Sequence, residues 1–454
     1  MSKAADTDVI AAIATPPGRG GIGIVRVSGP DLTGIVNGII GRPLASRVAT
    51  SAAFHGEHGD TLDQGIALFF PAPASYTGEN VLELQGHGGP AVLALVLRRC
   101  LDLGARVAEP GEFTKRAFLN DKIDLAQAEA VADLISATTA AGVRAATRSL
   151  VGEFSREVQA HLDRLVELRV FIEATLDFPE EDVDFVHAAD VSGKIQRLQQ
   201  TLEDLLGRSR QGRLLLEGLE VVLIGQPNVG KSSLLNQLVG EDRAIVTAVA
   251  GTTRDAIRSS VEVDGIPLHV IDTAGLRETS DAVEQIGVAR AWAEIERADL
   301  ALVITDACAP QHAGDAAIVA RLRPTLPRVV VRNKIDLAGV EARRGTVDGI
   351  AEVWLSAKTG SGVDLLRQAI LEVVGAEENT HDAFLARERH VRALDAAREH
   401  VALAATHLSP TSAPALELCA EELRQAHDVL GEITGAHTAD DLLGAIFSRF
   451  CIGK

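Results

Sequence analysis

The sequence predicts a multidomain protein that combines α+β and α/β architecture with a helical bundle. Three observations lead to this prediction. Gly and Pro punctuate short apolar runs up to about residue 119, strands and helices alternate from Glu220 to about residue 376, and long helical patterns lie on both sides of that alternation. Such alternation is typical of a doubly wound parallel sheet. We therefore expect an α/β domain inserted between two segments of one helical domain.

Composition limits the classes of partner and compartment. The 454 residues allow about three domains, and 44 basic against 63 acidic residues give a net charge of −19. An acidic surface argues against this chain making most of the contacts to a nucleic acid, because phosphate groups bind to positive charge. A content of 3% aromatic residues argues against a surface on which single-stranded bases stack. The four cysteines form no CxxC pair, which disfavours zinc and disulfides and fits a reducing cytosol. We find no signal peptide and no apolar run of about 18 residues, so we expect a cytoplasmic protein without a membrane span.

Residues 1–119 are predicted to form an α+β domain. Strand patterns cover Ile22–Val27, Gln64–Phe70 and Val81–Leu84, and a helical pattern covers Ala91–Leu103. Arg26 and Glu83 lie within strand patterns, and their spacing alone favours a solvated face of a half-exposed sheet. We interpret His87, in the sequence QGHGG, as a turn residue because no other residue at metal-ligand spacing accompanies it.

Residues 120–217 and 378–454 are predicted to be the two segments of the helical domain, with the α/β domain at 218–377. One apolar helix face comprises Leu125, Ala128, Val131, Ala132 and Ile135. Further helical patterns run through Leu176, from Val191 to Leu216, and over Phe384–His407, Ala415–Gly431 and Ala439–Phe450. An acidic run at 180–184 interrupts the first segment, and we interpret it as a solvated loop or a helix start rather than as a metal site.

The stretch after the strand at Val221–Ile224 fits the phosphate-binding loop G-x-x-x-x-G-K-[ST], from Gly225 to Ser232. Glycines let backbone N–H groups approach phosphate oxygens, and the following helix N-terminus adds its dipole. Lys231 supplies a positive charge to the β and γ phosphates, and the Ser232 hydroxyl is placed to bind Mg²⁺. The strand before the loop and the helix after it make a chance glycine-rich turn improbable.

Four more motifs follow in the order expected of a Ras-like GTPase. Thr253 in AGTTRD offers a second Mg²⁺ ligand, and Asp272 in DTAG can hold the magnesium shell. Asp336 in NKID can accept hydrogen bonds from the N1–H and 2-amino group of guanine, a donor pair that adenine lacks. We therefore predict GTP as the nucleotide. The residues expected to contact it are Asn228, Val229, Gly230, Lys231, Ser232, Ser233, Thr247, Ala248, Val249, Ala250, Gly251, Thr252, Thr253, Asp272, Thr273, Ala274, Gly275, Asn333, Lys334, Asp336, Ser356, Ala357 and Lys358.

The hydrolytic machinery departs from the Ras pattern. Ras-type enzymes orient the attacking water with a Gln after DxxG, but here Leu276 stands in that place. The acids that follow, Glu278, Asp281 and Glu284, are the alternatives for this role, and each can equally be a solvated surface charge. Asn228 presents an oxygen beside the phosphates, so a monovalent cation held there and by the loop at 247–252 can stand where an arginine finger would.

The sequence resembles the MnmE (TrmE) family of tRNA uridine-5-carboxymethylaminomethyl modification GTPases along its whole length. The matching stretches are ATPPGRGGIGIVRVSG, SYTGENVLELQGHGGP, PGEFTKRAFLNDKIDLAQAEAVADLI, GQPNVGKSSLLN, GTTRD, DTAGLRETSDAVEQIG, NKIDL and EITGAHTADDLLGAIFSRFCIGK. The nucleotide motifs alone indicate only a translation-factor-like GTPase, whereas the N-terminal stretches and the terminal FCIGK are specific. The resemblance implies an N-terminal folate-binding domain, a helical domain in two segments and an inserted P-loop GTPase domain.

The resemblance also assigns roles to residues. Arg26, Glu83, Lys122 and Lys454 match the contacts to 5-formyl-tetrahydrofolate or a related folate, which reverses our spacing-based interpretation of Arg26 and Glu83. Asn228, Thr247, Val249 and Thr252 match the potassium ligands, and Ser232 and Thr253 match the magnesium ligands. Glu284 matches the acid that positions water. Cys451 is important for modification in the family, and we leave open whether it is a reactive thiol at the folate site or a buried packing thiol.

The family resemblance implies a function with a partner. It predicts a homodimer formed through the N-terminal domains, which works with the flavoprotein MnmG (GidA), a carrier of FAD. Together they attach an aminomethyl or carboxymethylaminomethyl group to C5 of the wobble uridine of certain tRNAs, with most of the tRNA contact made by the partner. Two alternatives from other classes are a ribosome-assembly GTPase that acts as a binding switch and a signalling GTPase. The acidic balance and the N-terminal domain count against the first of these.

Overall fold

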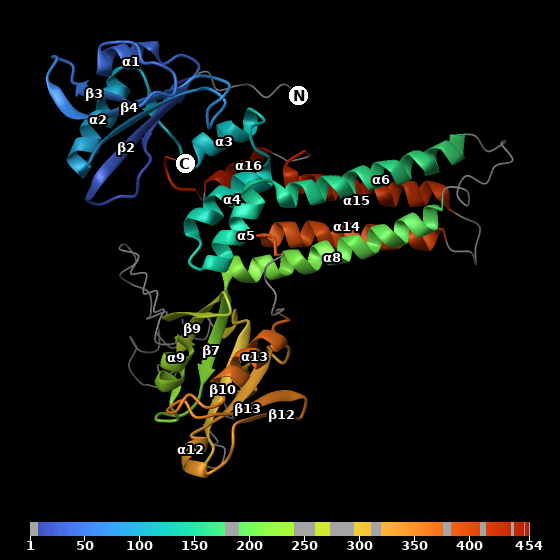
Figure 1. Cartoon of the computed structure of the whole chain (residues 1–454). Coiled ribbons are helices and arrows are strands. Elements are labelled where there is room, and N and C mark those ends of the chain that lie inside the picture. Colours follow the sequence, from blue (N-terminus) through green and yellow to red (C-terminus); the bar gives the residue numbers. More distant parts are fainter. Residues whose placement is uncertain are drawn as a thin grey trace. The chain divides into compact units, whose positions relative to one another are not determined.

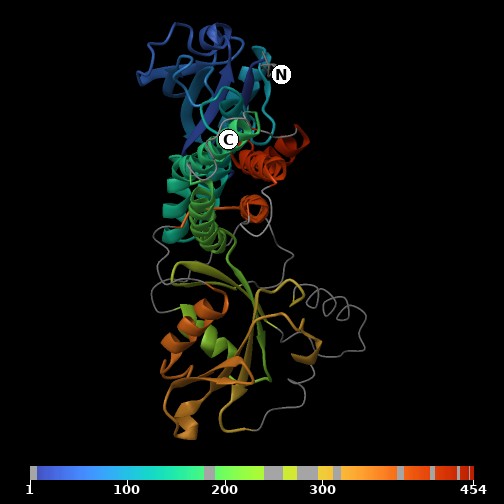
Figure 2. The same ribbon diagram turned by 90° about the vertical axis from the view of Figure 1, so that its right-hand side faces the viewer.

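The computed structural model describes residues 8–177, 190–239, 259–272, 295–309, 319–375, 383–408, 415–436, 440–448 and 450–453 (Figures 1 and 2). The chain divides into two compact units. One comprises Met1–Ala132, Leu150–Val166 and Arg424–Lys454, and the other comprises Asp133–Ser149 and Glu167–Leu423. The predicted fold class is confirmed, because a mixed α+β part, long helices and an α/β part are all present. The three boundaries between the predicted domain segments stay a prediction.

The first unit contains a six-stranded sheet in the order β3-β4-β5-β2-β1-β6. Its pairs are antiparallel except β1 with β6. Alternate residues such as Val25, Val27, Leu82 and Leu84 are buried in one core with α1 and α2, as the twofold period of a strand requires. The elements are β1 (Ile10–Ile13), β2 (Gly20–Gly29), α1 (Thr33–Ile40), β3 (Thr50–His55), β4 (Thr61–Phe70), β5 (Asn80–Gly88), α2 (Pro90–Asp102), β6 (Arg106–Val107) and α3 (Glu112–Leu119).

The interpretation of His87 as a turn residue is wrong. Strand β5 continues through Gly88, and Gly86 and Gly88 pair with Gly23 and Gly20 of β2. These glycines serve close packing, since a Cβ at Gly88 would lie 2.6 Å from the carbonyl oxygen of Gly20. The exposed His87 ring contacts Asp63 Oδ1 through Nδ1 at 2.7 Å. Burial raises the pKa of Asp63, but hydrogen bonds from His87 outweigh burial and hold this pKa below its ordinary value.

A cluster of five charged side chains fixes helix α3 to the rest of the first unit. The Glu112 carboxylate is 4% exposed and accepts hydrogen bonds from Arg106 at 2.6 Å and from Arg116 at 2.9 Å. Arg116 also contacts Asp8 at 2.7 Å and Glu79 at 3.1 Å. Burial raises the pKa of Glu112, but the hydrogen bonds from Arg106, from the Glu109 amide and from Arg116 lower it by more.

This cluster predicts an acid-sensitive region. A carboxyl whose pKa is lower in the folded state stabilises that state above its ordinary pKa of 4.5, and the stabilisation is lost as pH falls further. We expect native-state hydrogen exchange of residues 106–119 to accelerate below about pH 4.5. Glu112→Gln should flatten this pH dependence and reduce the opening free energy at pH 7 by about 2 kcal/mol. The exposed Glu109→Gln is the control, and an equal response of both variants would contradict the prediction.

Long helices make up the next part of the chain, and none among the described residues is long and apolar enough to cross a membrane. Helices α8 and α14 lie alongside each other (Figure 1). The helices are α4 (Leu125–Ser136), α5 (Ala140–Leu150), α6 (Glu153–Asp177), α8 (Val191–Glu217), α14 (Glu388–His407), α15 (Leu416–Thr434) and α16 (Asp440–Phe447).

Helix α14 begins at Glu388, four residues later than the sequence pattern suggested. The residues before it are held by tertiary contacts instead. The Phe384 ring lies between the guanidinium groups of Arg148 and Arg208, each 4.8 Å from its centroid. The Ser149 hydroxyl donates a hydrogen bond to the carbonyl oxygen of Leu385 at 3.3 Å. The apolar sequence pattern therefore begins before the helix does, and residues 384–387 are not helical.

The α/β part has a seven-stranded sheet in the order β12-β13-β11-β10-β7-β9-β8. The five central strands are parallel, whereas β12 and β8 at the edges are antiparallel. Val221 and Leu223 of β7 face the core that contains α9 and α13, and Val222 and Ile224 face a second core. The elements are β7 (Leu219–Ile224), α9 (Lys231–Val239), β8 (Ser259–Val263), β9 (Ile266–Asp272), β10 (Leu300–Asp306), β11 (Arg328–Asn333), α12 (Ile335–Ala338), β12 (Arg343–Val347), β13 (Ile350–Trp354) and α13 (Val363–Val373).

Candidate functional site

The phosphate-binding loop has the strand–loop–helix context that the motif requires. β7 ends at Ile224, the loop follows, and α9 begins at Lys231. The Lys231 ammonium group donates a hydrogen bond to the carbonyl oxygen of Gly225 at 2.6 Å. Ser232 and Ser233 are exposed in the first turn of α9, where unpaired backbone N–H groups and the helix dipole favour an anion. This arrangement can bind phosphate groups and present a hydroxyl to their metal ion.

Asn333 connects three of the predicted motifs. Its side chain is buried, and its amide nitrogen donates to the carbonyl oxygen of Val229 at 2.7 Å. Its Oδ1 accepts from the backbone N–H groups of Lys334 at 2.8 Å and Ala357 at 2.9 Å. A Cβ at Gly230 would lie 2.3 Å from Asn333 Nδ2, so this close approach requires glycine. The phosphate loop and the two guanine-binding motifs are therefore held together.

The predicted guanine-binding part of the site contains Asp336 and its neighbours. The Ser356 hydroxyl donates to Asp336 Oδ1 at 2.7 Å, which fixes one carboxylate oxygen, and Lys358 is exposed. Sequence reasoning missed Asp306, whose Oδ2 lies 2.7 Å from the Lys334 ammonium group. The hydrogen bond from Lys334 lowers the pKa of Asp306. The available signal was its position at the carboxyl end of buried β10, beside Asn333 of β11.

Part of the predicted nucleotide and catalytic set lies outside the described residues. These residues are Thr247, Ala248, Val249, Ala250, Gly251, Thr252, Thr253, Thr273, Ala274, Gly275 and Glu284, together with the alternatives Glu278 and Asp281. The backbone of Asp272 ends β9, beside the P-loop strand β7. The acidic run at 180–184 and Lys454 of the predicted folate set also lie outside the described part of the chain.

Arg26 and Glu83 form a pair across neighbouring strands. They are register partners on β2 and β5, and Arg26 Nε lies 3.1 Å from Glu83 Oε1. Their side chains are only 17% and 15% exposed, so the solvated face favoured by spacing is wrong. Tyr76 and Phe113 rings lie 5.6 and 5.8 Å from the Arg26 guanidinium carbon. Arg26 and Glu83 thus form a partly buried ion pair rather than one on a solvent-exposed sheet face.

The C-terminal segment closes one side of this pair. Arg26 Nη1 donates to the carbonyl oxygen of Gly453 at 3.5 Å, and Ile452 bridges to Pro110. A Cβ at Gly453 would lie 2.4 Å from the carbonyl oxygen of Ile13, so the chain passes tightly against β1. Cys451 is exposed, which excludes the alternative of a buried packing thiol. Gly453 therefore lies against β1 and β2 at this site.

Lys122 does not join the Arg26–Glu83 pair in the described structure. Its ammonium group donates instead to the carbonyl oxygen of Pro73 at 3.1 Å. Sequence reasoning missed Tyr76, whose hydroxyl lies 2.8 Å from Thr114 Oγ1 and whose pKa is raised by burial. It also missed Gln85, which donates to Glu83 Oε2 at 3.2 Å. Gln85 follows Glu83 by two residues, so its position on the same strand face was the available signal.

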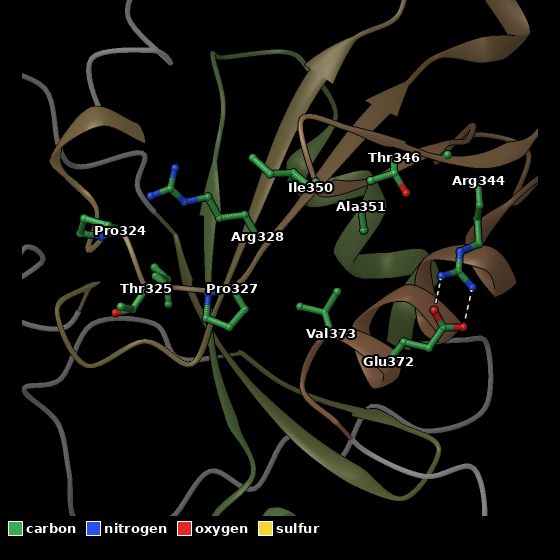
Figure 3. A pocket seen from close by; sticks show the side chains of 13 residues that line it. Pro324, Thr325, Pro327, Arg328, Arg344, Thr346, Ile350, Ala351, Glu372 and Val373 are labelled. Carbon is green, nitrogen blue, oxygen red and sulfur yellow. Dashed lines mark hydrogen bonds and ion pairs between the residues drawn. The ribbon is translucent and has the colours of Figure 1, made fainter.

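A cavity of about 510 Å³ opens at a different edge of the α/β sheet (Figure 3). Residues at the amino ends of β11 and β13 line it, among them Arg328 and Ile350. Arg344 and Glu372 form an ion pair on its wall, with Nη1 2.9 Å from Oε1. Ligands of parallel sheets bind at the carboxyl ends of strands, so this cavity is separate from the nucleotide site.

Comparisons with known proteins cover the whole chain. The family model described as GTP-binding protein TrmE N-terminus matches residues 9–122, and the model described as MnmE helical domain matches residues 125–451. The chain is 57% identical over 448 residues to the tRNA modification GTPase MnmE of Dechloromonas aromatica (strain RCB), covering 99% of this chain and 100% of that protein. It is also 57% identical over 448 residues to the protein of that name from Azoarcus sp. (strain BH72), covering 98% of each. Among solved structures, the FeoB G-domain from Methanococcus jannaschii is 30% identical, covers 35% of this chain and 98% of its own, and has a TM-score of 0.25.

Proposed function

Because the chain belongs to the MnmE family and is a tRNA modification GTPase, we propose that it is potassium-dependent and acts with an FAD-containing partner. In this proposal the pair adds a (carboxymethyl)aminomethyl group to C5 of the wobble uridine of certain tRNAs, using a folate one-carbon unit. The observation that carries the GTPase half is the buried Asn333 side chain, which joins the phosphate loop to both guanine motifs. The family membership does not favour the alternative of a ribosome-assembly switch.

In this proposal, each residue of the nucleotide site has a separate role in GTP binding or hydrolysis. Lys231 balances the charge of the β and γ phosphates, and Asp336 accepts the two guanine donors. Ser232 and Thr253 would hold Mg²⁺, which supplies charge neutralisation between the phosphates when bound. The exposed Ser232 hydroxyl supplies an oxygen ligand of the kind that this hard cation prefers. Glu284 would hold the attacking water through a second water, in place of the missing Gln.

Asn228, Thr247, Val249 and Thr252 would hold the potassium ion, whose charge replaces an arginine finger. The described member of this set supports the assignment. Asn228 adopts a left-handed backbone conformation with φ 64° inside the phosphate loop. Asn tolerates this conformation, and its amide also brings an oxygen ligand, as an alkali cation prefers. Glycine adopts this backbone conformation most readily, so the amide oxygen is what Asn adds at this position.

We predict that Asn228→Gly lowers kcat for GTP hydrolysis about 100-fold in potassium buffer, because glycine keeps the backbone conformation but removes the amide oxygen. Replacing K⁺ by Na⁺ should lower the rate of the unchanged protein and leave the variant nearly unaffected. GTP affinity should stay within about twofold in both experiments. The exposed Asn236→Ala on α9 is the control. Hydrolysis that is indifferent to the cation would contradict the potassium assignment.

The folate site is proposed at Arg26, Glu83, Lys122 and Lys454. A carboxylate can accept the paired N–H groups of a pterin ring, and a guanidinium can bind a carboxylate or formyl oxygen. The geometry of Arg26 and Glu83 beside Tyr76 supports this donor set. The exposed Cys451 belongs to the segment that closes the site, so a reactive role for its thiol remains part of the proposal.

A homodimer through the N-terminal domains is proposed, with exposed apolar side chains of the six-stranded sheet at the contact. Ile22 and Ile66, on β2 and β4, are 69% and 42% exposed there. Burial of such side chains against a second copy would remove apolar surface from water. We further propose that the acidic chain associates with the flavoprotein MnmG in the cytoplasm and meets tRNA mainly through that complex.

Nucleoside analysis of tRNA tests the function as a whole. A strain that lacks this protein should lose the C5 modification of the wobble uridine in the affected tRNAs. The unchanged protein should restore it, and Lys231→Ala should not. A deletion strain with normal wobble-uridine modification would overturn the proposed reaction.

A further inference from the structure

The β8–β9 hairpin stands between the two segments that we expect to sense the γ-phosphate. Thr253 precedes β8, and Asp272 ends β9. The strands pair antiparallel up to Val263 and Ile266. The connecting residues, Asp264 and Gly265, have φ values of 48° and 88°. Positive φ at both positions is typical of a tight two-residue turn that matches the strand twist. The hairpin is thus a short, regular element that ends in a rigid turn.

The turn packs directly against helix α5, within the same compact unit. A Cβ at Gly265 would lie 2.8 Å from the Cβ of Ala141. Ala141, Ala145 and Ala146 are buried on one helix face. They belong to the same apolar core as five residues of the hairpin, which are Val261, Val263, Ile266, Leu268 and Val270. The small side chains of α5 allow this close approach, so the half-buried Gly265 packs on the helix while its neighbour Asp264 is exposed.

A second contact fixes the hairpin at the end of helix α8. A Cβ at Gly218, the residue after α8, would lie 2.6 Å from the carbonyl oxygen of Pro267. His269 Nε2 lies 3.2 Å from the carbonyl oxygen of Glu217. Strand β7 begins at the next residue, and Leu219 is the register partner of Leu268. No linker separates the helix from the sheet, so the hairpin is held on two sides by helical elements.

We propose that the β8–β9 hairpin positions the γ-phosphate segments relative to α5, so that the nucleotide state and the state of α5 are energetically coupled. The inference rests on the proposed roles of Thr253 and of the Asp272–Gly275 motif. A strand rises about 3.3 Å per residue, so the seven residues of β9 reach roughly 23 Å from that motif to the turn. Packed contacts shift between discrete arrangements instead of deforming continuously. By linkage, whatever moves α5 must also act on the nucleotide site.

The first test measures hydrogen exchange of residues 140–150 in the full-length protein, loaded either with GDP or with a non-hydrolysable GTP analogue. The coupling predicts different protection of α5 in the two states. Ala141→Gly removes the Cβ that meets the turn and should abolish that difference. It should also lower kcat for GTP hydrolysis about fivefold with KM nearly unchanged. The exposed Ala140→Gly on the same helix controls for the helix propensity of glycine.

The outcomes separate this inference from the proposed function. Equal α5 protection in the two nucleotide states of the unchanged protein would overturn the coupling, even if GTP is hydrolysed normally. That measurement decides the question if Ala141→Gly fails to fold. Equal effects of Ala140→Gly and Ala141→Gly on kcat would also overturn it. Loss of potassium dependence or of tRNA modification would instead count against the proposed function and leave the coupling intact.

Discussion

Replacing Asp336 by Asn should lower the affinity for GTP about 100-fold and create binding of xanthosine triphosphate. In our assignment, the carboxylate of Asp336 accepts hydrogen bonds from guanine N1–H and from the 2-amino group. The amide of an Asn would place its own NH2 group, a donor, against the 2-amino group of guanine, which is also a donor. Two donors that face each other stay unpaired once the bound base excludes water, which costs more than the loss of one hydrogen bond. Xanthine carries a carbonyl in place of the 2-amino group and therefore matches the amide.

The control for this prediction is Asp348→Asn, which makes the same change of charge. Asp348 lies in the turn between β12 and β13, at the opposite end of β13 from Ser356, and its φ of 53° is one that Asn accepts. Its nucleotide affinities should equal those of the unchanged protein. Affinities can be measured by titration with fluorescent nucleotide analogues. An Asp336→Asn variant that keeps GTP affinity and gains none for xanthosine triphosphate would contradict the guanine assignment.

Replacing Gly212 by Ala should destabilise the second unit by more than about 3 kcal/mol. Gly212 is buried on α8, and a Cβ there would lie 1.4 Å from the carbonyl oxygen of Phe384. The opposing atom belongs to the backbone, and the Phe384 segment is itself held by Arg148, Arg208 and Ser149. The segment cannot yield by a simple rotamer change, so α8 and the start of α14 must separate.

Gly207→Ala on the same helix provides a matched control with the opposite sign. Gly207 is exposed, and no atom lies within 4 Å of its added Cβ. Alanine should stabilise the helix there by about 0.5–1 kcal/mol, because it has the higher helix propensity. Chemical denaturation monitored by circular dichroism and by Trp354 fluorescence distinguishes the two variants. A Gly212→Ala protein as stable as the Gly207→Ala protein would show that the contact with Phe384 does not constrain the fold.

The phosphate loop was predictable because its chemistry is local. Strand β7, the glycines, Lys231 and the start of α9 are contiguous, so residue type and spacing determine the loop and the direction of its N–H groups. The same holds for the strands and helices with clear periodicity, such as β2 and α8. The family could be assigned for a related reason, since its distinctive motifs are uninterrupted stretches of sequence.

Contacts between distant residues were not predictable from local pattern. The hydrogen bond from Asn333 to Val229 joins residues 104 positions apart, and the contact of Arg26 with Gly453 spans 427 positions. A charged residue in a strand pattern reveals the side of the sheet it occupies but not what covers that side. The spacing of Arg26 and Glu83 therefore suggested solvent, whereas the C-terminal segment and two aromatic rings lie against the pair.

The sequence by itself determined the order of the elements, the nucleotide motifs and the family. Only the tertiary structure decided where the Arg26–Glu83 pair is buried, that Phe384 lies outside α14, that His87 belongs to a strand, and that the β8–β9 turn packs on α5. The physical reason is the range of the interactions. Periodicity and backbone preference act over a few residues, whereas burial and close packing depend on which distant segments arrive at the same place.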